Sequence, residues 1–193
     1  STQTKLGDIG YTDVNGDGKI DGEDQVRIGK PTMPHFTYAF DFSLGYEGFT
    51  LSGLLYGTGE RYMTFGNRYQ SGEGKYLYYE NQLNYWRPDN TGADFPRISI
   101  SSGVNGNNNK AGSTFWMRNA SYLRLKDLQL SYDFKYKYLK RCDWLQTCRV
   151  NLSGSNLFTI SGVSKFFDPE TSSTSGDGYP VQRVYSIGVT IGF

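Results

Sequence analysis

The sequence has few of the residues on which most catalytic and metal centres depend. Its 193 residues include a single histidine, His35, which follows a proline at the start of an expected strand. A lone histidine in that position is more typical of a strand end than of a catalytic base. Asp168 and Glu170 lie close together in a loop, but two neighbouring carboxylates alone are a poor indication of glycoside hydrolysis. Since the chain also has no Gly-rich phosphate loop and no nucleophile elbow, we expect that it is not an enzyme.

The two cysteines point to no particular chemistry. Cys142 and Cys148 are six residues apart, a spacing that fits no zinc or redox motif. A disulfide in an oxidising compartment and two free thiols are equally compatible with the sequence.

A strong excess of either charge is also missing. The chain has 20 Lys and Arg residues against 19 Asp and Glu residues, a net charge of +1. Nucleic-acid binding requires a basic excess or a basic patch. The only dense basic stretch, residues 135–141, alternates Lys with Tyr and is more typical of a solvated turn. We therefore expect no nucleic-acid partner.

Long apolar runs are absent as well. No stretch approaches the roughly 18 apolar residues that a membrane helix requires. Residues 1–8 also lack the apolar segment of a secretory signal peptide. If the chain is exported, as its strand pattern indicates, we expect that a signal has been removed and that the chain is a piece of a longer protein.

Aromatic residues, in contrast, are abundant. The chain contains 16 Tyr and 12 Phe, although its mean hydropathy is negative. A transmembrane β-barrel combines these two properties, because its outer wall and girdles are aromatic while its lumen is polar. Alternation with period two dominates the chain, and no convincing helical stretch appears. The composition therefore favours an outer-membrane barrel.

The clearest strand pattern spans residues 36–46, with aromatic and apolar residues on one face. Its eleven residues match the roughly 9–11 that a tilted strand needs to cross a bilayer. Glu47 and Gly48 form a two-residue turn, after which residues 49–55 continue the alternation in phase. Because residues that flank a two-residue turn share a face, this pattern predicts a hairpin.

Three further strands are expected at about residues 122–134, 149–158 and 184–193. In the first of them Leu123 and Leu125 fall on the opposite phase from the later leucines, so a bulge near Lys126 is expected.

These patterns predict an all-β fold made of the C-terminal strands of a transmembrane antiparallel β-barrel, about five strands of a larger barrel. The expected division is an extracellular loop at 1–35, followed by barrel strands at 36–193 with long extracellular loops at about 57–121 and 159–183. Turns 47–48 and 135–147 then lie in the periplasm, as short barrel turns do. Five strands cannot close a barrel, and an open edge in lipid leaves backbone groups unpaired. The chain is therefore expected to be incomplete.

The alternation also assigns side chains to the two faces of the expected barrel wall. The lipid face is predicted to carry Phe40, Phe42, Ile187 and Val189, and the lumen face Asp41, Ser43, Ser186 and Thr190. The alternative fold is a soluble β-sandwich, stapled by calcium, that binds glycans at the cell surface, since sandwich strands alternate too.

One motif carries metal chemistry. Residues 13–24 follow the calcium-loop pattern D-x-[DN]-x-[DN]-G, with Gly18 at the sharp turn. Calcium prefers six to eight oxygen ligands. The expected ligands are Asp13, Asn15, Asp17, the Lys19 carbonyl, Asp21 through water, and Asp24. No helix pattern flanks the loop, so we expect an EF-hand-like loop with a structural calcium ion; the other interpretation is a solvated Gly/Asp-rich turn.

The order of motifs resembles the C-terminal end of the SusC/RagA family of TonB-dependent outer-membrane importers over nearly the whole chain. The matching stretches are GDI at 7–9 with the loop at 13–24, GKP at 29–31, FTY at 36–38, YWRPDN at 85–90, PR at 96–97, FWMRNASYLRLKD at 115–127, SNLFT at 155–159, FDPE at 167–170, YP at 179–180 and GF at 192–193. Lys135 departs from the pattern, because the family often has a proline after this strand.

The resemblance implies a barrel of about 22 strands with a plug in its lumen. It implies import of glycans or peptides across the outer membrane of a Gram-negative, Bacteroidota-type bacterium. The implied partners are a SusD-like surface lipoprotein, TonB acting through a plug region outside this chain, the remaining barrel and plug segments, and outer-membrane lipids. Phe193 is the expected assembly signal. Substrate-binding residues are not identified, because the loop aromatics (Tyr62, Phe65, Tyr69, Tyr76, Tyr78, Tyr79) suit sugar stacking, lid contact or packing.

Overall fold

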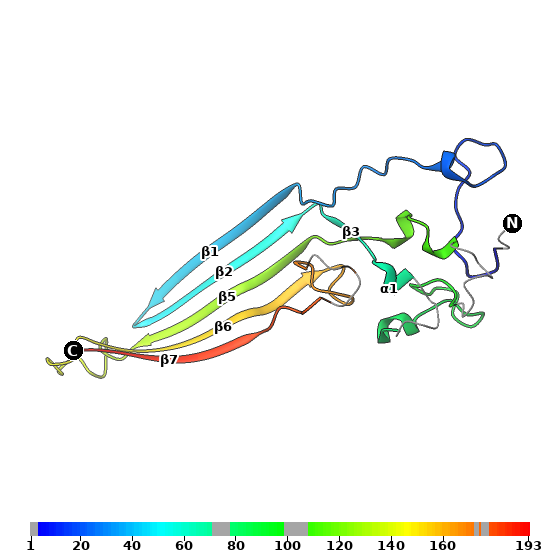
Figure 1. The fold of residues 1–193 in the computed structure, drawn as a ribbon. Helices are drawn as coiled ribbons and strands as arrows, with labels where there is room; N and C mark the ends of the chain where they lie inside the picture. The colour runs from blue at the N-terminus through cyan, green and yellow to red at the C-terminus, as the bar shows by residue number, and fades with distance from the viewer. Residues whose placement is uncertain (1–3, 71–77, 99–107, 172–173, 175–177) are drawn as a thin grey trace.

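The computed structural model describes residues 4–70, 78–98, 108–171, 174 and 178–193. Its main element is a five-stranded antiparallel sheet with the strand order β1-β2-β5-β6-β7 (Figure 1). The strands are β1 (Phe36–Tyr46), β2 (Phe49–Gly59), β5 (Tyr122–Asp133), β6 (Thr147–Ser161) and β7 (Val184–Gly192). The fold is all-β, as predicted, with a strand at each of the expected places.

The β1–β2 hairpin forms as the sequence predicts. Tyr46 pairs with Phe49, and both Glu47 and Gly48 have positive φ, as a two-residue hairpin turn requires. Along the hairpin, the β1 aromatics lie across glycines of β2. A Cβ atom added at Gly53 would lie only 2.7 Å from the Phe42 ring. The glycines of β2 therefore provide the space in which these rings lie flat on the sheet.

The bulge is also present at the predicted position. Leu54 pairs with Asp127 and Leu55 with Leu125, which leaves Lys126 as an extra residue in β5. On the other side of β5, Lys126 lies opposite two residues of β6, Asn156 and Leu157, so that β6 has one extra residue there. The bulge brings the leucines that precede it into phase with those that follow it, so one face stays apolar along the whole of β5.

The register gives the sheet one apolar and one polar face, because directly paired residues share a face. The apolar face carries Phe40, Phe42, Leu51, Leu55, Leu125, Leu128, Leu152, Phe158, Ile187 and Val189. The polar face carries Asp41, Ser43, Ser52, Arg124, Gln129, Ser153, Thr159, Ser186 and Thr190. The predicted separation of the two sets is confirmed, whereas their assignment to lipid and lumen stays a prediction.

Two strands are longer than predicted. β2 continues to Gly59, and β6 spans Thr147–Ser161 where residues 149–158 were expected. Tyr122 at the start of β5 pairs with both Thr58 and Ser161. The backbone of the neighbouring strand, and not the alternation of side chains, therefore sets where these strands end.

The predicted long loop at 57–121 is more ordered than its sequence pattern suggests. Within it, β3 (Tyr62–Thr64) pairs with β4 (Met117–Asn119) and extends the β2–β5 ladder. The remaining elements are single turns: η1 (Gly22–Asp24), α1 (Asn67–Gln70), η2 (Glu80–Leu83), η3 (Asn108–Lys110) and η4 (Thr114–Trp116). Among the described residues, no helix has the length and apolar character needed to cross a membrane.

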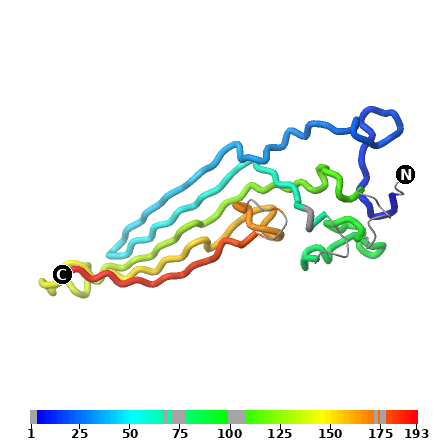
Figure 2. The backbone as a smooth tube through the Cα atoms, viewed as in Figure 1, coloured from blue at the N-terminus to red at the C-terminus, as the bar shows by residue number. Residues whose placement is uncertain are grey.

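A hydrophobic core lies beyond the loop end of the sheet, where the described loop segments come together (Figure 2). Its buried members are Ile9, Met63, Phe65, Tyr69, Phe95, Trp116, Ala120, Val163 and Phe167. The Phe65 ring is central, with its centroid 4.8 Å from that of Tyr69 and 4.9 Å from that of Phe166. We call these buried residues the aromatic core.

The aromatic core decides the role of several loop aromatics. Phe65 and Tyr69 are buried in it and Tyr79 packs against it, so these three residues serve packing. Tyr62 contacts the Lys30 ammonium, and Tyr78 is exposed. Tyr76 lies outside the described residues.

The alternative β-sandwich is wrong. A sandwich requires two sheets packed face to face, but the described residues form one five-stranded sheet and, beyond its loop end, a two-stranded sheet of β3 and β4 that does not pack on its face. The edge strands β1 and β7 are exposed along nearly their whole length. Exposed edges of this length are typical of a sheet that continues into further strands of a larger β-structure.

Candidate functional site

A buried arginine on the polar face of β5 organises the loop end of the sheet. The Arg124 side chain is 2% exposed, and its Nη2 lies 2.8 Å and 2.7 Å from the two carboxylate oxygens of Asp168. Arg124 Nε donates a hydrogen bond of 2.8 Å to Oγ1 of Thr159, its register partner in β6. The guanidinium thus joins two strands to the loop that follows β6.

Glu170 extends this network. Its Oε1 accepts a hydrogen bond of 2.7 Å from the Tyr122 hydroxyl, and its Oε2 accepts one of 3.1 Å from Lys126 Nζ. Arg124 Nη1 lies 3.2 Å from Oε2 but not in hydrogen-bonding geometry. Burial acts to raise the pKa of Glu170, but the hydrogen bonds from Lys126 and Tyr122 and the nearby positive charges outweigh it, so the pKa lies below its ordinary value.

The lowered pKa of Glu170 defines the pH range in which the network stabilises the folded state. A carboxylate with a depressed pKa stabilises the folded state while it is ionised. The contribution is therefore complete at neutral pH and is lost as the pH falls below the ordinary carboxylate value of 4.5 and through the lowered pKa.

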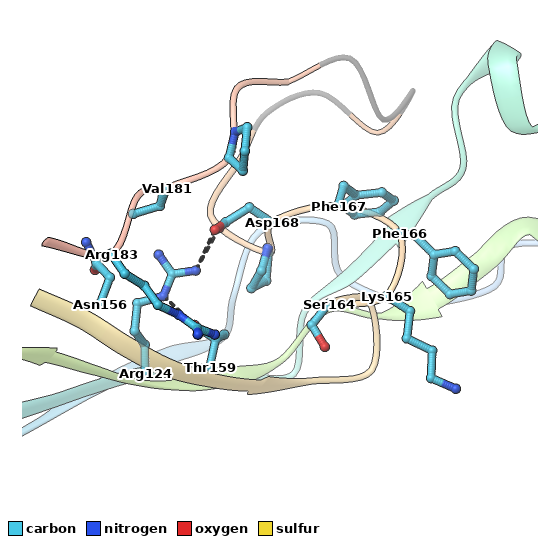
Figure 3. Close-up of a pocket in the computed structure, with 12 residues that line it drawn as sticks. Arg124, Asn156, Thr159, Ser164, Lys165, Phe166, Phe167, Asp168, Val181 and Arg183 are labelled. Carbon is cyan, nitrogen blue, oxygen red and sulfur yellow. Dashed lines mark hydrogen bonds and ion pairs between the residues drawn. The ribbon is translucent and has the colours of Figure 1, made fainter. Parts of the chain in front are cut away.

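The network borders a cavity of about 530 Å³ between β5, β6 and the connection from β6 to β7. Figure 3 shows the Arg124 side chain reaching from the sheet toward Asp168, with Arg183 entering the same space. Phe166 and Phe167 lie farther along the loop. The remaining lining residues are Asn156, Thr159, Ser164, Lys165, Pro169, Pro180 and Val181.

The chemistry of this cavity is that of a polar recognition surface. Asp168 neutralises Arg124, whereas Lys165 and Arg183 have no polar side-chain partner among the described residues. Ser164 has no histidine beside it, and its hydroxyl donates to the Ser161 carbonyl. Among the described residues the cavity has no nucleophile–base pair, and its free charges are positive.

The sequence alone did not identify this site. Asp168 and Glu170 stood out only as two carboxylates in a loop, and Arg124 only as part of a motif. The sequence does contain one indication of the site, because Arg124 lies between two leucines in an expected strand. An arginine in such a place is buried, and a buried arginine requires an acidic partner.

In the predicted calcium loop, the carboxylates accept hydrogen bonds from the backbone amides of the loop itself. Asp13 Oδ1 and Oδ2 accept hydrogen bonds from the Gly16 and Gly18 amides, at 2.6 Å and 2.8 Å. Asp24 Oδ1 and Oδ2 accept from Val14 and Asp21, at 2.7 Å and 2.9 Å. These two hydrogen bonds lower the pKa of Asp24, the one from Asp21 most strongly.

The remaining predicted ligands make similar turns. The side-chain oxygens of Asn15, Asp17 and Asp21 each accept a bond from the amide two residues later. Within the described residues, no group of three or more His, Cys, Asp or Glu side chains is arranged to hold a metal ion. Calcium binding would therefore require these side chains to turn toward a common centre, and it stays a prediction.

The other singled-out residues lie apart from the cavity. His35 Nδ1 lies 2.6 Å from Glu60 Oε2 at the exposed start of β1. Phe193 follows the last strand and stacks on Trp144, with ring centroids 5.9 Å apart. Cys142 and Cys148 are not joined by a disulfide in this structure.

Sequence comparison finds two TonB-dependent receptors that are similar to the chain. It is 27% identical over 202 residues to TonB-dependent receptor P26 of Formosa agariphila, covering 97% of this chain and 20% of that protein. It is 26% identical over 196 residues to TonB-dependent receptor P3 of the same organism, covering 95% of this chain and 19% of the relative. No protein-family model matches the chain. The chain thus spans about a fifth of the length of these relatives.

Structural comparison agrees. The fold superposes on the RagAB peptide importer in its closed-closed state with a TM-score of 0.69 and 27% identity, covering 95% of this chain and 20% of that chain. For the open-open state the TM-score is 0.68, with 27% identity and coverage of 91% and 19%. These relatives are receptors and importers, which supports the expectation that the chain is not an enzyme. In sequence and in fold, the chain is therefore similar to a segment of TonB-dependent receptors and of the RagAB peptide importer.

Proposed function

We propose that this chain forms part of the wall of a TonB-dependent importer in the outer membrane of a Gram-negative, Bacteroidota-type bacterium. The observation that carries the proposal is the similarity to TonB-dependent receptor P26, which extends over 97% of the chain. An apolar and a polar sheet face, each continuous across five strands, suit a wall between lipid and an aqueous lumen.

The proposed cargo is a peptide or a glycan, captured with the help of a SusD-like surface lipoprotein. RagAB is described as a peptide importer, which favours peptides of the two. Energy would come from TonB through a plug region that this chain does not contain. In this arrangement the 530 Å³ cavity faces the lumen near its outer mouth, because Arg124 and Thr159 project from the polar face.

A deletion in the source organism tests the proposal. Removal of the gene should prevent growth on oligopeptides as the nitrogen source, or on one class of oligosaccharide as the carbon source, and loss of TonB should have the same effect. The tagged full-length protein should purify from detergent-solubilised outer membranes together with a lipoprotein. Unchanged growth on every substrate, or a tagged protein found in the soluble fraction, would show that the proposal is wrong.

A further inference from the structure

The end of the sheet at its tight turns is lined with exposed aromatic side chains. Tyr46, Phe49 and Tyr132 are register partners on the apolar face. The rings of Phe49 and Tyr132 lie 4.4 Å apart, and Tyr46 is 76% exposed. An aromatic row thus crosses the first three strands of the sheet at one level.

The connection between β5 and β6 continues this aromatic row. Tyr138 packs against the Tyr132 ring at 6.3 Å, and Tyr136 covers the β1–β2 turn at Gly48. At the other side of the connection, Trp144 stacks on Phe193. Tyr136, Tyr138, Trp144 and Phe193 are all more than half exposed. Rings of this kind, exposed at the edge of an apolar band, are typical of a membrane–water interface.

Positive charge is concentrated in the same connection. Residues 134–146 include four basic residues and one acidic residue, a net charge of +3 in a chain whose total is +1. Arg149 lies 3.7 Å from Asp133, and Lys135 Nζ donates to the Cys142 carbonyl.

The other three cations of the connection are Lys137, Lys140 and Arg141. They are exposed, and the structure, which describes this whole connection, gives them no polar partner. Three cations free of protein partners therefore lie next to four exposed rings.

We infer that residues 134–146 are a binding surface for the headgroups of anionic phospholipids. The rings lie at headgroup depth, and the ammonium and guanidinium groups contact lipid phosphates. The inference rests on the proposed membrane function, since it requires the apolar face to meet lipid. It goes beyond that function by assigning a lipid class and three recognition residues.

The test uses the full-length transporter, purified in detergent and titrated with phosphatidylglycerol or phosphatidylcholine in native mass spectrometry. The wild-type protein should bind phosphatidylglycerol several-fold more tightly at low salt, and the preference should shrink as salt screens the charges. The triple variant Lys137→Gln, Lys140→Gln, Arg141→Gln should lose most of this preference. A matched triple variant at the loop end, Lys5→Gln, Arg27→Gln, Lys30→Gln, should keep it.

The other outcomes distinguish failure of this inference from failure of the proposed membrane function. Equal lipid preference in the wild type and the turn variant would overturn the inference. A turn variant that assembles poorly but keeps its lipid preference would indicate a protein partner at this surface, and would equally overturn it. A full-length protein that is monodisperse without detergent would instead overturn the membrane function on which the inference rests.

Discussion

At the scale of single residues, Arg124 links the sheet to the loop beyond it. Its guanidinium is buried, contacts Asp168 at 2.7 Å and donates to Thr159. Truncating one member of a buried ion pair leaves the other charge unpaired, which typically costs about 3–5 kcal/mol. The effect should be concentrated in residues 163–171, because these are the loop residues that Arg124 holds.

We therefore expect that Arg124→Gln in the full-length protein makes this loop susceptible to protease while the barrel stays folded. Hydrogen exchange or limited proteolysis in detergent would measure the change. Arg183→Gln is the matched control, because Arg183 lines the same cavity but has no polar partner among the described residues. Equal protection in the two variants would show that the Arg124 network does not hold the loop.

Phe193 gives a second prediction at this scale. Its ring is 75% exposed and stacks on Trp144, so its contribution to stability should not exceed the roughly 1.5–3 kcal/mol of one fully buried large side chain. If Phe193 is an assembly signal, its deletion should strongly reduce the amount of barrel in the outer membrane while the melting temperature of the remaining protein changes little. Quantitative blotting of membrane fractions and thermal unfolding would measure the two effects, and unchanged membrane levels would count against the signal role.

At the scale of elements, the two sheet faces lead to a paired prediction. An arginine on the lipid face near mid-depth should cost about 2–4 kcal/mol, whereas one in the lumen should cost little. Val189→Arg and Ser186→Arg are suitable partners, since both lie within β7 on opposite faces. Urea unfolding in lipid vesicles would compare them, and equal losses would contradict the face assignment.

The calcium loop makes an element-scale prediction of its own. If Asp13, Asn15, Asp17, the Lys19 carbonyl and Asp24 share one ion, six or more oxygens should lie about 2.3–2.6 Å from it. Asp13→Ala with Asp17→Ala should abolish calcium-dependent protection of residues 13–24 and leave the strands unchanged. Calorimetry and hydrogen exchange at millimolar calcium would measure this, with Asp89→Ala as an exposed acidic control. An ordered wild-type loop that binds no calcium would show that the motif is a solvated turn.

The strands were predictable where the alternation of apolar and polar side chains marks them. The hairpin at 36–55 follows from alternation, and so does the bulge at Lys126, because a change of phase must be absorbed somewhere. The ends of β2 and β6 do not follow from alternation, because they are set by pairing with the backbone of β5 at Tyr122. The aromatic core and the Arg124–Asp168 pair were missed because both join segments far apart in the chain, and no local pattern encodes that proximity.

At the scale of the whole molecule, the sheet is open on both sides. β1 and β7 each expose one edge of unpaired backbone groups, and no described residue outside the sheet covers the apolar face. Expressed alone, the 193-residue chain should therefore aggregate in buffer and disperse only in detergent. Light scattering with and without detergent would measure this, and a monodisperse monomer in buffer would contradict it.

The aromatic core has a mechanical consequence for the same end of the molecule. It joins the segments around Ile9, Phe65, Phe95, Trp116 and Phe167, which span most of the chain. Moving one of these segments alone would expose large rings to water, at about 25 cal/mol per Å² of apolar surface. We therefore expect the described loop segments at this end to move as one unit.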